Sequence, residues 1–150
     1  RFAICEFVNI YDEGIYFEPI YRFVTGVNAN DFASELLKVT NGKYGVITKD
    51  LEKCKQDEIS LPETIKNIDA FIKAYIEKNG GEVDYVHGES NLKKLVDDKG
   101  DAVGVLFEKL DKADLFKYVS KNGAFPRKTF SMGEGVEKRY YLEGRRITKC

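Results

Sequence analysis

The sequence has few of the residues from which metal sites and catalytic sites are commonly built. Its 150 residues include one histidine, one methionine, three cysteines and no tryptophan. Cys5, Cys54 and Cys150 lie far apart, no Cys-x-x-Cys pair occurs, and one histidine cannot complete a Cys/His zinc site of usual spacing. We therefore expect no metal site, and thiols that stay free as in a reducing cytoplasm.

The signature motifs of well-known enzyme classes are also missing. The sequence contains no P-loop, no dinucleotide-binding glycine pattern, no H-E-x-x-H zinc motif and no G-x-S-x-G nucleophile motif. Its aromatic residues are interleaved with apolar ones, as core strands require, and do not form the stacking platform of an RNA-binding sheet. No catalytic residue and no cofactor can be named, and the sequence leaves open whether the protein is an enzyme.

Long apolar stretches are absent as well. The longest, residues 102–107, is far too short to span a bilayer and follows no signal-like segment. We therefore expect a cytoplasmic protein with no membrane partner. The chain opens at Arg1, enters an apolar strand-like segment at once, and has its one methionine at Met132. This start predicts that the chain is the C-terminal fragment of a longer protein.

The overall composition is that of a globular domain. Apolar residues make up 43% of the chain and charged residues 33%, which excludes the disordered and fibrous classes. A chain of this length is the usual size of one domain and buries enough surface to fold without disulfides. We expect residues 1–150 to form a single α+β domain.

Apolar residues at helical spacing predict four helices between the two ends of the chain. The clearest one starts with Ser60 and Glu63, which match a capping box, and ends at Asn79. One more helix begins at Asn30, and another is capped by Asp111. The expected buried faces are Phe32, Leu36 and Val39; Ile65, Ile68, Ile72, Tyr75 and Ile76; Leu92, Leu95 and Val96; and Leu115, Tyr118 and Val119.

Strands are expected before, between and after these helices. Residues 2–11 and 15–25 flank a turn and predict a β-hairpin, and residues 136–148 predict a second hairpin. Residues 44–47, 83–86 and 102–107 predict single strands, whereas the charged residues 48–59 predict a mobile surface segment. The alternation of helices and strands favours a mixed β-sheet flanked by helices, with hairpins near both ends of the chain.

The C-terminal end is basic. From Arg127 onward seven basic residues stand against three acidic ones, although the whole chain has a net charge of −1. Within this end, the run Phe125-Pro126-Arg127-Lys128-Thr129 places two cations and a hydroxyl after a proline, a combination suited to a phosphate or a carboxylate. Spacing alone favours the alternative interpretations, a solvated basic surface and a loop that only routes the chain.

Two further polar positions are candidates. His87 follows the strand 83–86 and precedes a glycine, at a strand end where ligands often bind, although a structural histidine bonded to a carbonyl is the favoured alternative. Glu6 shares a predicted face with apolar residues, and Lys138 intrudes on another apolar face. These two side chains are expected to form an ion pair if the hairpin register is as predicted.

Several segments resemble the uncharacterised proteins catalogued as domain of unknown function 1015, in particular the C-terminal region of a clostridial-type member. The matching segments are Phe7-Val8-Asn9, Asp12-Glu13-Gly14, Pro19-Ile20-Tyr21-Arg22, Asp84-Tyr85-Val86-His87-Gly88, Ala102-Val103, Phe125-Pro126-Arg127-Lys128-Thr129 and Glu137-Lys138-Arg139-Tyr140-Tyr141-Leu142-Glu143.

The resemblance implies a parent protein with a further N-terminal domain. In the family that domain carries a D-G-H-H-R-type motif similar to one in ParB-like and sulfiredoxin-like nucleotide-using proteins, and the motif is absent here. Family members commonly have histidine where this chain has Tyr21, which puts in doubt any role that needs an imidazole there. The resemblance also implies a shared ligand site lined by Arg22, His87, Arg127 and Lys128, to which we add Lys138.

Three functions are consistent with these features. The leading one is a lobe that helps the N-terminal domain of the parent protein to bind a phosphorylated small molecule or a nucleotide. In this role Arg127 and Lys128 would contact the anion, while His87 and Arg22 would orient it. The second is the C-terminal part of a nucleotide-dependent phosphotransferase whose catalytic motif lies in the missing half. The third is a nucleic-acid adaptor using the basic C-terminal strands, although the interleaved acids disfavour nucleic acid as a partner.

Overall fold

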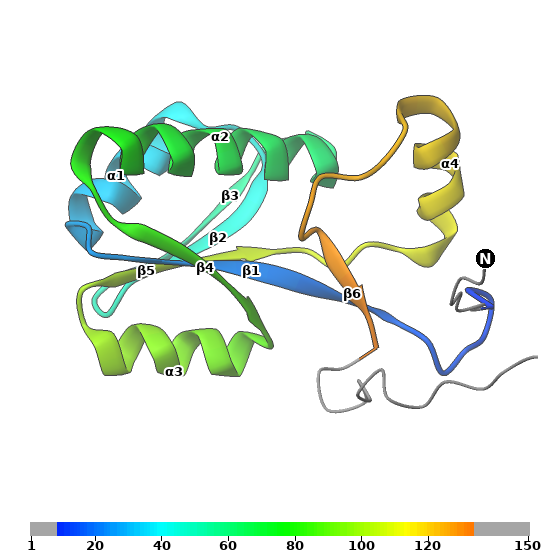
Figure 1. The fold of residues 1–150 in the computed structure, drawn as a ribbon, viewed down its shortest axis with the longest axis horizontal. Coiled ribbons are helices and arrows are strands. Elements are labelled where there is room, and N and C mark those ends of the chain that lie inside the picture. The colour runs from blue at the N-terminus through cyan, green and yellow to red at the C-terminus, as the bar shows by residue number, and fades with distance from the viewer. Residues whose placement is uncertain (1–8, 134–150) are drawn as a thin grey trace, which may run out of the picture.

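The computed structural model describes residues 9–133 (Figure 1). These residues form an α+β fold with four helices and six strands, which confirms the expected fold class. In chain order the elements are β1 (Phe17–Thr25), α1 (Ala29–Val39), β2 (Lys43–Ile47), β3 (Glu52–Gln56), α2 (Leu61–Asn79), β4 (Glu82–His87), α3 (Glu89–Lys99), β5 (Ala102–Phe107), α4 (Lys112–Asn122) and β6 (Phe130–Met132).

The strand order explains why the sheet is antiparallel. The strands follow the order β3-β2-β5-β1-β4, and β6 pairs with the first residues of β1. All five pairings among the described residues are antiparallel, so the expected mixed sheet is wrong for this part of the chain. The expectation failed because the two parallel strands of each strand–helix–strand unit are not neighbours and have another strand between them. β1 and β2 run in the same direction with β5 between them, and β4 and β5 do so with β1 between them.

Helices cover both faces of the sheet. In Figure 1, α1 and α2 lie on one side and α3 lies on the other. The first side is the larger core, where Val24, Val46 and Val105 of the sheet are fully buried. The buried helix residues of the two sides include Phe32, Ala33 and Leu36 of α1, Ile65, Ile68 and Ile72 of α2, and Leu92 and Val96 of α3.

α4 stands apart from this core. It has no buried residue, and in Figure 1 it projects to one side of the sheet. Tyr118 of α4 lies 4.2 Å from the ring of Phe125, and Phe125 lies edge-on to Phe130 at 5.8 Å. Phe130 in turn stacks on Phe17 of β1 at 4.3 Å. A row of four aromatic rings therefore connects α4 and the loop after it to the start of β1.

The helix caps agree with the sequence in part. Asp111 accepts a hydrogen bond from the Ala113 amide and caps α4 as expected. α1 starts one residue earlier than predicted, with Asn28 as its cap accepting from the Asp31 amide. Ser60 stands at the cap of α2 but makes no side-chain bond there, so the predicted capping box is not formed.

Three other expectations are corrected. The segment 48–59 is not a mobile connection, because its residues Glu52–Gln56 form β3 and pair with all of β2. Val39 and Leu95, predicted to be buried, are 61% and 40% exposed. Val39 is the last residue of α1, while Leu95 lines a groove between α3, β1 and β4.

Other predictions lie wholly or partly outside the described residues. β1 confirms a strand within residues 15–25, but most of the first strand of that hairpin lies outside the described range. The whole C-terminal hairpin, and with it Glu6, Lys138 and their predicted ion pair, also lies outside it. Within the described range, none of the four helices has the length and the hydropathy that crossing a membrane requires.

Candidate functional site

Arg22 lies at the centre of the candidate site and is fully buried. The period-two pattern of β1 explains this burial, because it places Arg22 on the same face as Ile20 and Val24, beneath α2. Its Nε and Nη2 atoms donate to the two carboxylate oxygens of Asp69 in α2, each at 2.8 Å. This bidentate pair places a buried cation against one matched anion, the geometry in which such a pair is strongest.

The rest of the Arg22 guanidinium binds backbone. Nη1 donates to the carbonyl of Ile20 at 2.7 Å and to the carbonyl of Lys128 at 2.6 Å, and Nη2 reaches the carbonyl of Arg127 at 3.4 Å. Arg22 therefore holds the loop before β6 against the sheet. Its donors are used within the protein, so it positions the candidate loop and does not present a charge to a ligand.

The anchored loop presents two cations to solvent. Arg127 and Lys128 are both exposed. Lys128 has a positive φ of 57°, the one non-glycine residue with positive φ among residues 9–133. Such a conformation is unfavourable for a side chain with a Cβ and persists where surrounding contacts impose it. Two contacts impose this conformation on Lys128. Its carbonyl accepts from Arg22, and the next residue, Thr129, is buried and donates its hydroxyl to the Pro126 carbonyl at 2.7 Å.

Tyr85 connects the loop to β4. It lies directly opposite Arg22 in the register of β1 and β4, so both side chains share one face of the sheet. Arg22 lies over the Tyr85 ring at 5.1 Å, and the Nζ atom of Lys128 lies 5.7 Å from the same ring. Both distances are within the range of cation–π attraction. Tyr85 itself is 40% exposed and so lines the surface beside the two cations.

His87 lies two residues further along β4, opposite Ile20 and on the same face as Tyr85. Its Nδ1 atom is 3.3 Å from an Oε2 oxygen of Glu18 in β1. The favoured sequence interpretation, a bond from histidine to a backbone carbonyl, is replaced by this contact with a carboxylate. Both side chains are partly exposed, so the pair lies at the margin of the site.

The structure thus brings together four of the five predicted residues. Arg22 bonds to the backbone of Arg127 and of Lys128, and His87 shares the sheet face of Arg22 and Tyr85. The fifth, Lys138, lies outside the described residues. In the part of the chain that the structure describes, no hydrogen bond or ion pair joins His87 to the loop, and the cations and the histidine stand at opposite ends of the group.

Sequence reasoning missed Asp69, Tyr85 and Glu18. A signal for Asp69 was present, because period two in β1 places Arg22 between two core residues and a buried guanidinium requires an acidic partner. Asp69 stands beside Ile68 on a helix with a predicted buried face, where such a partner would be sought. No sequence signal identified Tyr85 or Glu18, since both depend on the register of β4.

The described residues show no metal-binding group. Within 9–133, no three histidine, cysteine, aspartate or glutamate side chains lie close enough to hold an ion. What the site offers chemically is two exposed cations beside the ring of Tyr85. Two grooves of the described surface lie away from these residues.

Comparisons with known proteins bear on the fold. No protein-family model matches the chain, and no curated protein matches it. A solved structure of a conserved hypothetical protein from Pyrococcus furiosus is similar, with a TM-score of 0.58 and 14% sequence identity. The similarity covers 85% of this chain and 60% of that protein, so the chain spans less than two thirds of the length of the structure it resembles. At this identity the likeness shows the fold alone.

Proposed function

We propose that this chain is a ligand-binding lobe whose loop 125–129 binds the anionic group of a phosphorylated small molecule or a nucleotide. Arg127 and Lys128 contact the anion, His87 orients it from β4, and Arg22 holds the loop in place. The observation that carries the proposal is the anchoring of the loop by Arg22 through the carbonyls of both cationic residues. A loop fixed in this way presents its cations without the entropy loss of ordering the loop backbone on binding.

The Tyr85 ring supports the same function. An exposed aromatic face beside two cations can pack against the sugar or base of a nucleotide while the cations hold its phosphate. The resemblance to the domain of unknown function 1015 remains a prediction, and we include in the proposal that an N-terminal domain of the parent protein completes the binding site. A phosphotransferase activity would then require that domain.

The experiment is a thermal-shift screen of this chain, and of a longer parent protein, against nucleotides, sugar phosphates and phosphoamino acids. A ligand present at about 100 times its dissociation constant stabilises the folded state by about 2.7 kcal/mol. We expect the double variant Arg127→Ala/Lys128→Ala to lose this stabilisation.

The matched control is Lys121→Ala, which removes an exposed cation from the last turn of α4, before the loop. It should leave ligand binding unchanged. Binding that survives the double variant would refute the loop as the anion site. Stabilisation of the longer protein alone would move the site to the other domain, and turnover by the longer protein alone would favour the phosphotransferase.

A further inference from the structure

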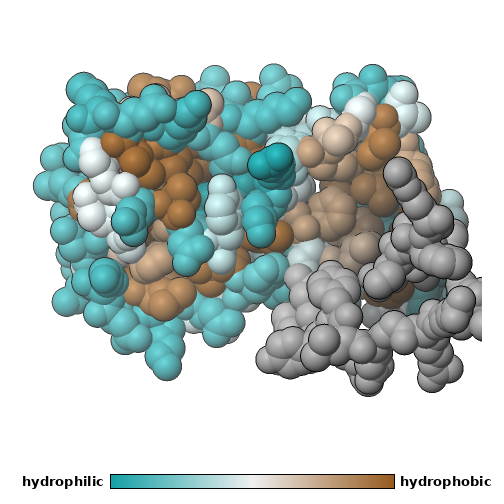
Figure 2. Space-filling model, viewed as in Figure 1, coloured by the Kyte–Doolittle hydropathy of each residue, from teal (hydrophilic) through white to brown (hydrophobic). Residues whose placement is uncertain are grey.

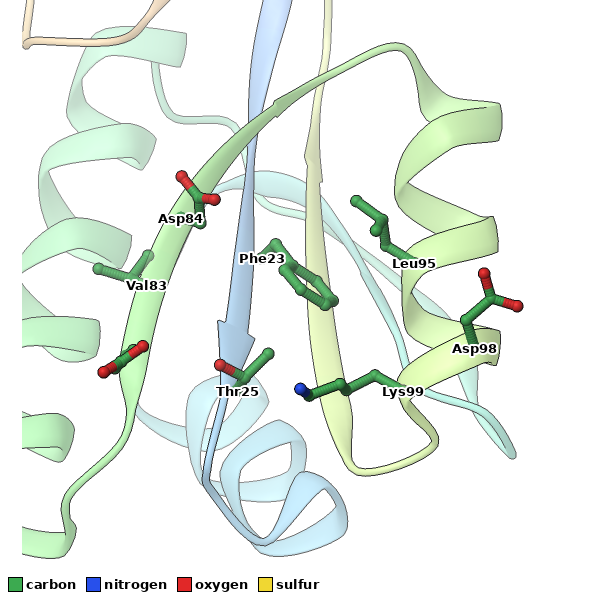
Figure 3. Close-up of a pocket in the computed structure, with 8 residues that line it drawn as sticks. Phe23, Thr25, Val83, Asp84, Leu95, Asp98 and Lys99 are labelled. Carbon is green, nitrogen blue, oxygen red and sulfur yellow. The ribbon is translucent and has the colours of Figure 1, made fainter.

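The outer side of β4 is a sheet edge with a groove beside it. Among residues 9–133, β4 pairs with β1 on one side and with no strand on the other. The groove has a volume of about 440 Å³ and runs between β4, β1 and the second half of α3 (Figure 3). In the space-filling view, apolar patches lie on this side of the molecule between polar rims over α2 and α3 (Figure 2).

The groove has an apolar floor and an acidic margin. Phe23 of β1 and Leu95 of α3 point toward each other across it in Figure 3. The side chains of Glu82, Asp84 and Asp98 stand around this floor and are all exposed. Among residues 9–133, Lys99 is the one cationic side chain that lines the groove. The groove therefore fits an occupant with both apolar surface and positive charge.

Backbone groups on the outer side of β4 bond to local side chains and not to another strand of the described residues. The Tyr85 amide donates to the Asp84 carboxylate at 2.7 Å, and the His87 carbonyl accepts from the Asn91 amide group at 3.0 Å. Alternate residues of a strand direct their backbone groups to the same side, so Val83 belongs to this outer row as well. Local side chains thus cover part of a row that a further strand can bind.

We propose that β4 binds an extended basic segment of a partner protein by strand addition, with lysine or arginine at alternate positions and apolar residues between them. On the added strand, the cations lie beside Glu82 and Asp84, and their aliphatic stems cover Phe23 and Leu95. The apolar residues continue the opposite face, beside Val83 and Tyr85. The Asp84 carboxylate then pairs with a cation, while the Tyr85 amide bonds to the partner.

Charge disfavours a second copy of this chain as the occupant. Pairing of β4 with another β4 would bring Glu82 and Asp84 of the two copies to the same face of one continuous sheet. Like charges on adjacent strands are destabilising, and the exposed acids of the edge act against self-association. A basic strand converts the same acids into favourable partners.

The test is an NMR titration with a probe peptide, acetylated and amidated, that alternates lysine and valine over seven residues. Two further peptides serve as controls. One replaces every lysine by glutamate, and the other has the same composition with its valines grouped together. We expect the alternating peptide to bind with shifts in β4 and α3 and with slowed hydrogen exchange at the Val83 and Tyr85 amides. The grouped peptide should bind about tenfold more weakly.

Charge reversal on this chain separates the groove from general attraction. Asp84→Lys and Asp98→Lys should each weaken binding by about tenfold, because each sets a cation against the basic peptide. Asp97→Lys is the matched control, since Asp97 is exposed on the same helix but lines a different groove. It should change the affinity less than about twofold.

Several results would overturn the proposal. They are no binding up to about 1 mM peptide, equal binding of the grouped peptide, unchanged exchange of the two β4 amides, and equal effects of Asp97→Lys and Asp98→Lys. The Arg127→Ala/Lys128→Ala variant should bind the peptide normally. Loss of peptide binding in that variant would contradict the proposal, whereas loss of anion binding there bears on the loop alone.

Discussion

Arg22 illustrates how one buried charge can organise distant segments. Its guanidinium joins β1 to α2 and to the loop before β6. In the sequence, Arg22 lies 47 residues from Asp69 and 106 residues from Lys128. A buried ion pair contributes little net stability when compared with apolar residues, but removal of one partner leaves an uncompensated charge. The value of this pair therefore lies in fixing where the loop sits.

The first prediction concerns this pair. Asp69→Ala should lower the free energy of unfolding by about 3 kcal/mol, because the Arg22 charge loses its partner in the core. Urea unfolding measures the effect. Lys73→Ala is the matched control on the same helix, since Lys73 forms only an exposed bridge with Glu77 and its removal should change stability by less than about 0.5 kcal/mol. Equal effects of the two variants would show that the Arg22 pair is not organising the core.

At the scale of elements, the packing of α3 against the sheet depends on a glycine. Gly104 of β5 leaves room for a side chain of the neighbouring strand β2 and for one of α3. A Cβ atom at this position would stand 2.6 Å from Ile47 of β2 and 2.9 Å from Leu92 of α3. Real Cβ atoms do not approach other carbons so closely, so α3 lies as near to the sheet as it does because residue 104 has no side chain.

Gly104→Ala should therefore destabilise the protein by about 1–3 kcal/mol through overpacking beneath α3. The companion variant is Gly45→Ala in β2, where the nearest atom to the added carbon would be 3.3 Å away, on the flexible Leu106 side chain. We expect it to have the smaller effect of the two. Thermal unfolding of both variants provides the comparison, and an equal loss in both would contradict the packing argument.

At the scale of the whole molecule, stability should depend on pH in the alkaline range. Burial is the main cause that raises the pKa of Tyr21 and of Tyr44 above the ordinary value of 10.0. Glu89 and Glu18 act in the same direction on the pKa of Tyr21. Because the folded state holds these phenols neutral, their contribution is complete below pH 10.0 and is lost as the pH rises above that value.

We expect the free energy of unfolding to be flat between neutral pH and about pH 10 as far as these groups are concerned, and to fall above it. Urea unfolding at a series of alkaline pH values measures the slope. Tyr21→Phe should make the slope shallower, while Tyr11→Phe should leave it unchanged because Tyr11 is 80% exposed. An unchanged slope in the Tyr21 variant would contradict the assignment.

The elements that could be predicted from the sequence are those whose burial leaves a pattern in adjacent residues. The isoleucines of α2 and the apolar run of β5 identify these elements because burial on one face or both leaves a pattern in adjacent residues. β3 carries no such pattern, since its side chains are mostly exposed and only its pairing with β2 makes it a strand. The positions of β5 between β2 and β1, and of β1 between β5 and β4, are long-range pairings that leave no pattern in adjacent residues.

The candidate site follows the same division. Arg127 and Lys128 were found because a proline and two cations are adjacent in the sequence. The role of Arg22 as an anchor could not be predicted in this way. It depends on the position of Asp69 in α2 above β1 and on the return of the loop across β1. The partnership of His87 with Glu18 likewise depends on the position of β1 beside β4.

The position of β1 also bears on how the protein is made. β1 is the first strand of the described fold, yet its partners β4, β5 and β6 all come from residues 82–132. A chain that emerges from the ribosome with its N-terminal end first must hold the apolar residues of β1 without a partner while most of the domain is still being synthesised. The hairpin of β2 and β3 can close early, but the sheet waits for β5. The apolar residues of β1 therefore stay unpaired with the sheet until residues 82–107 have been synthesised.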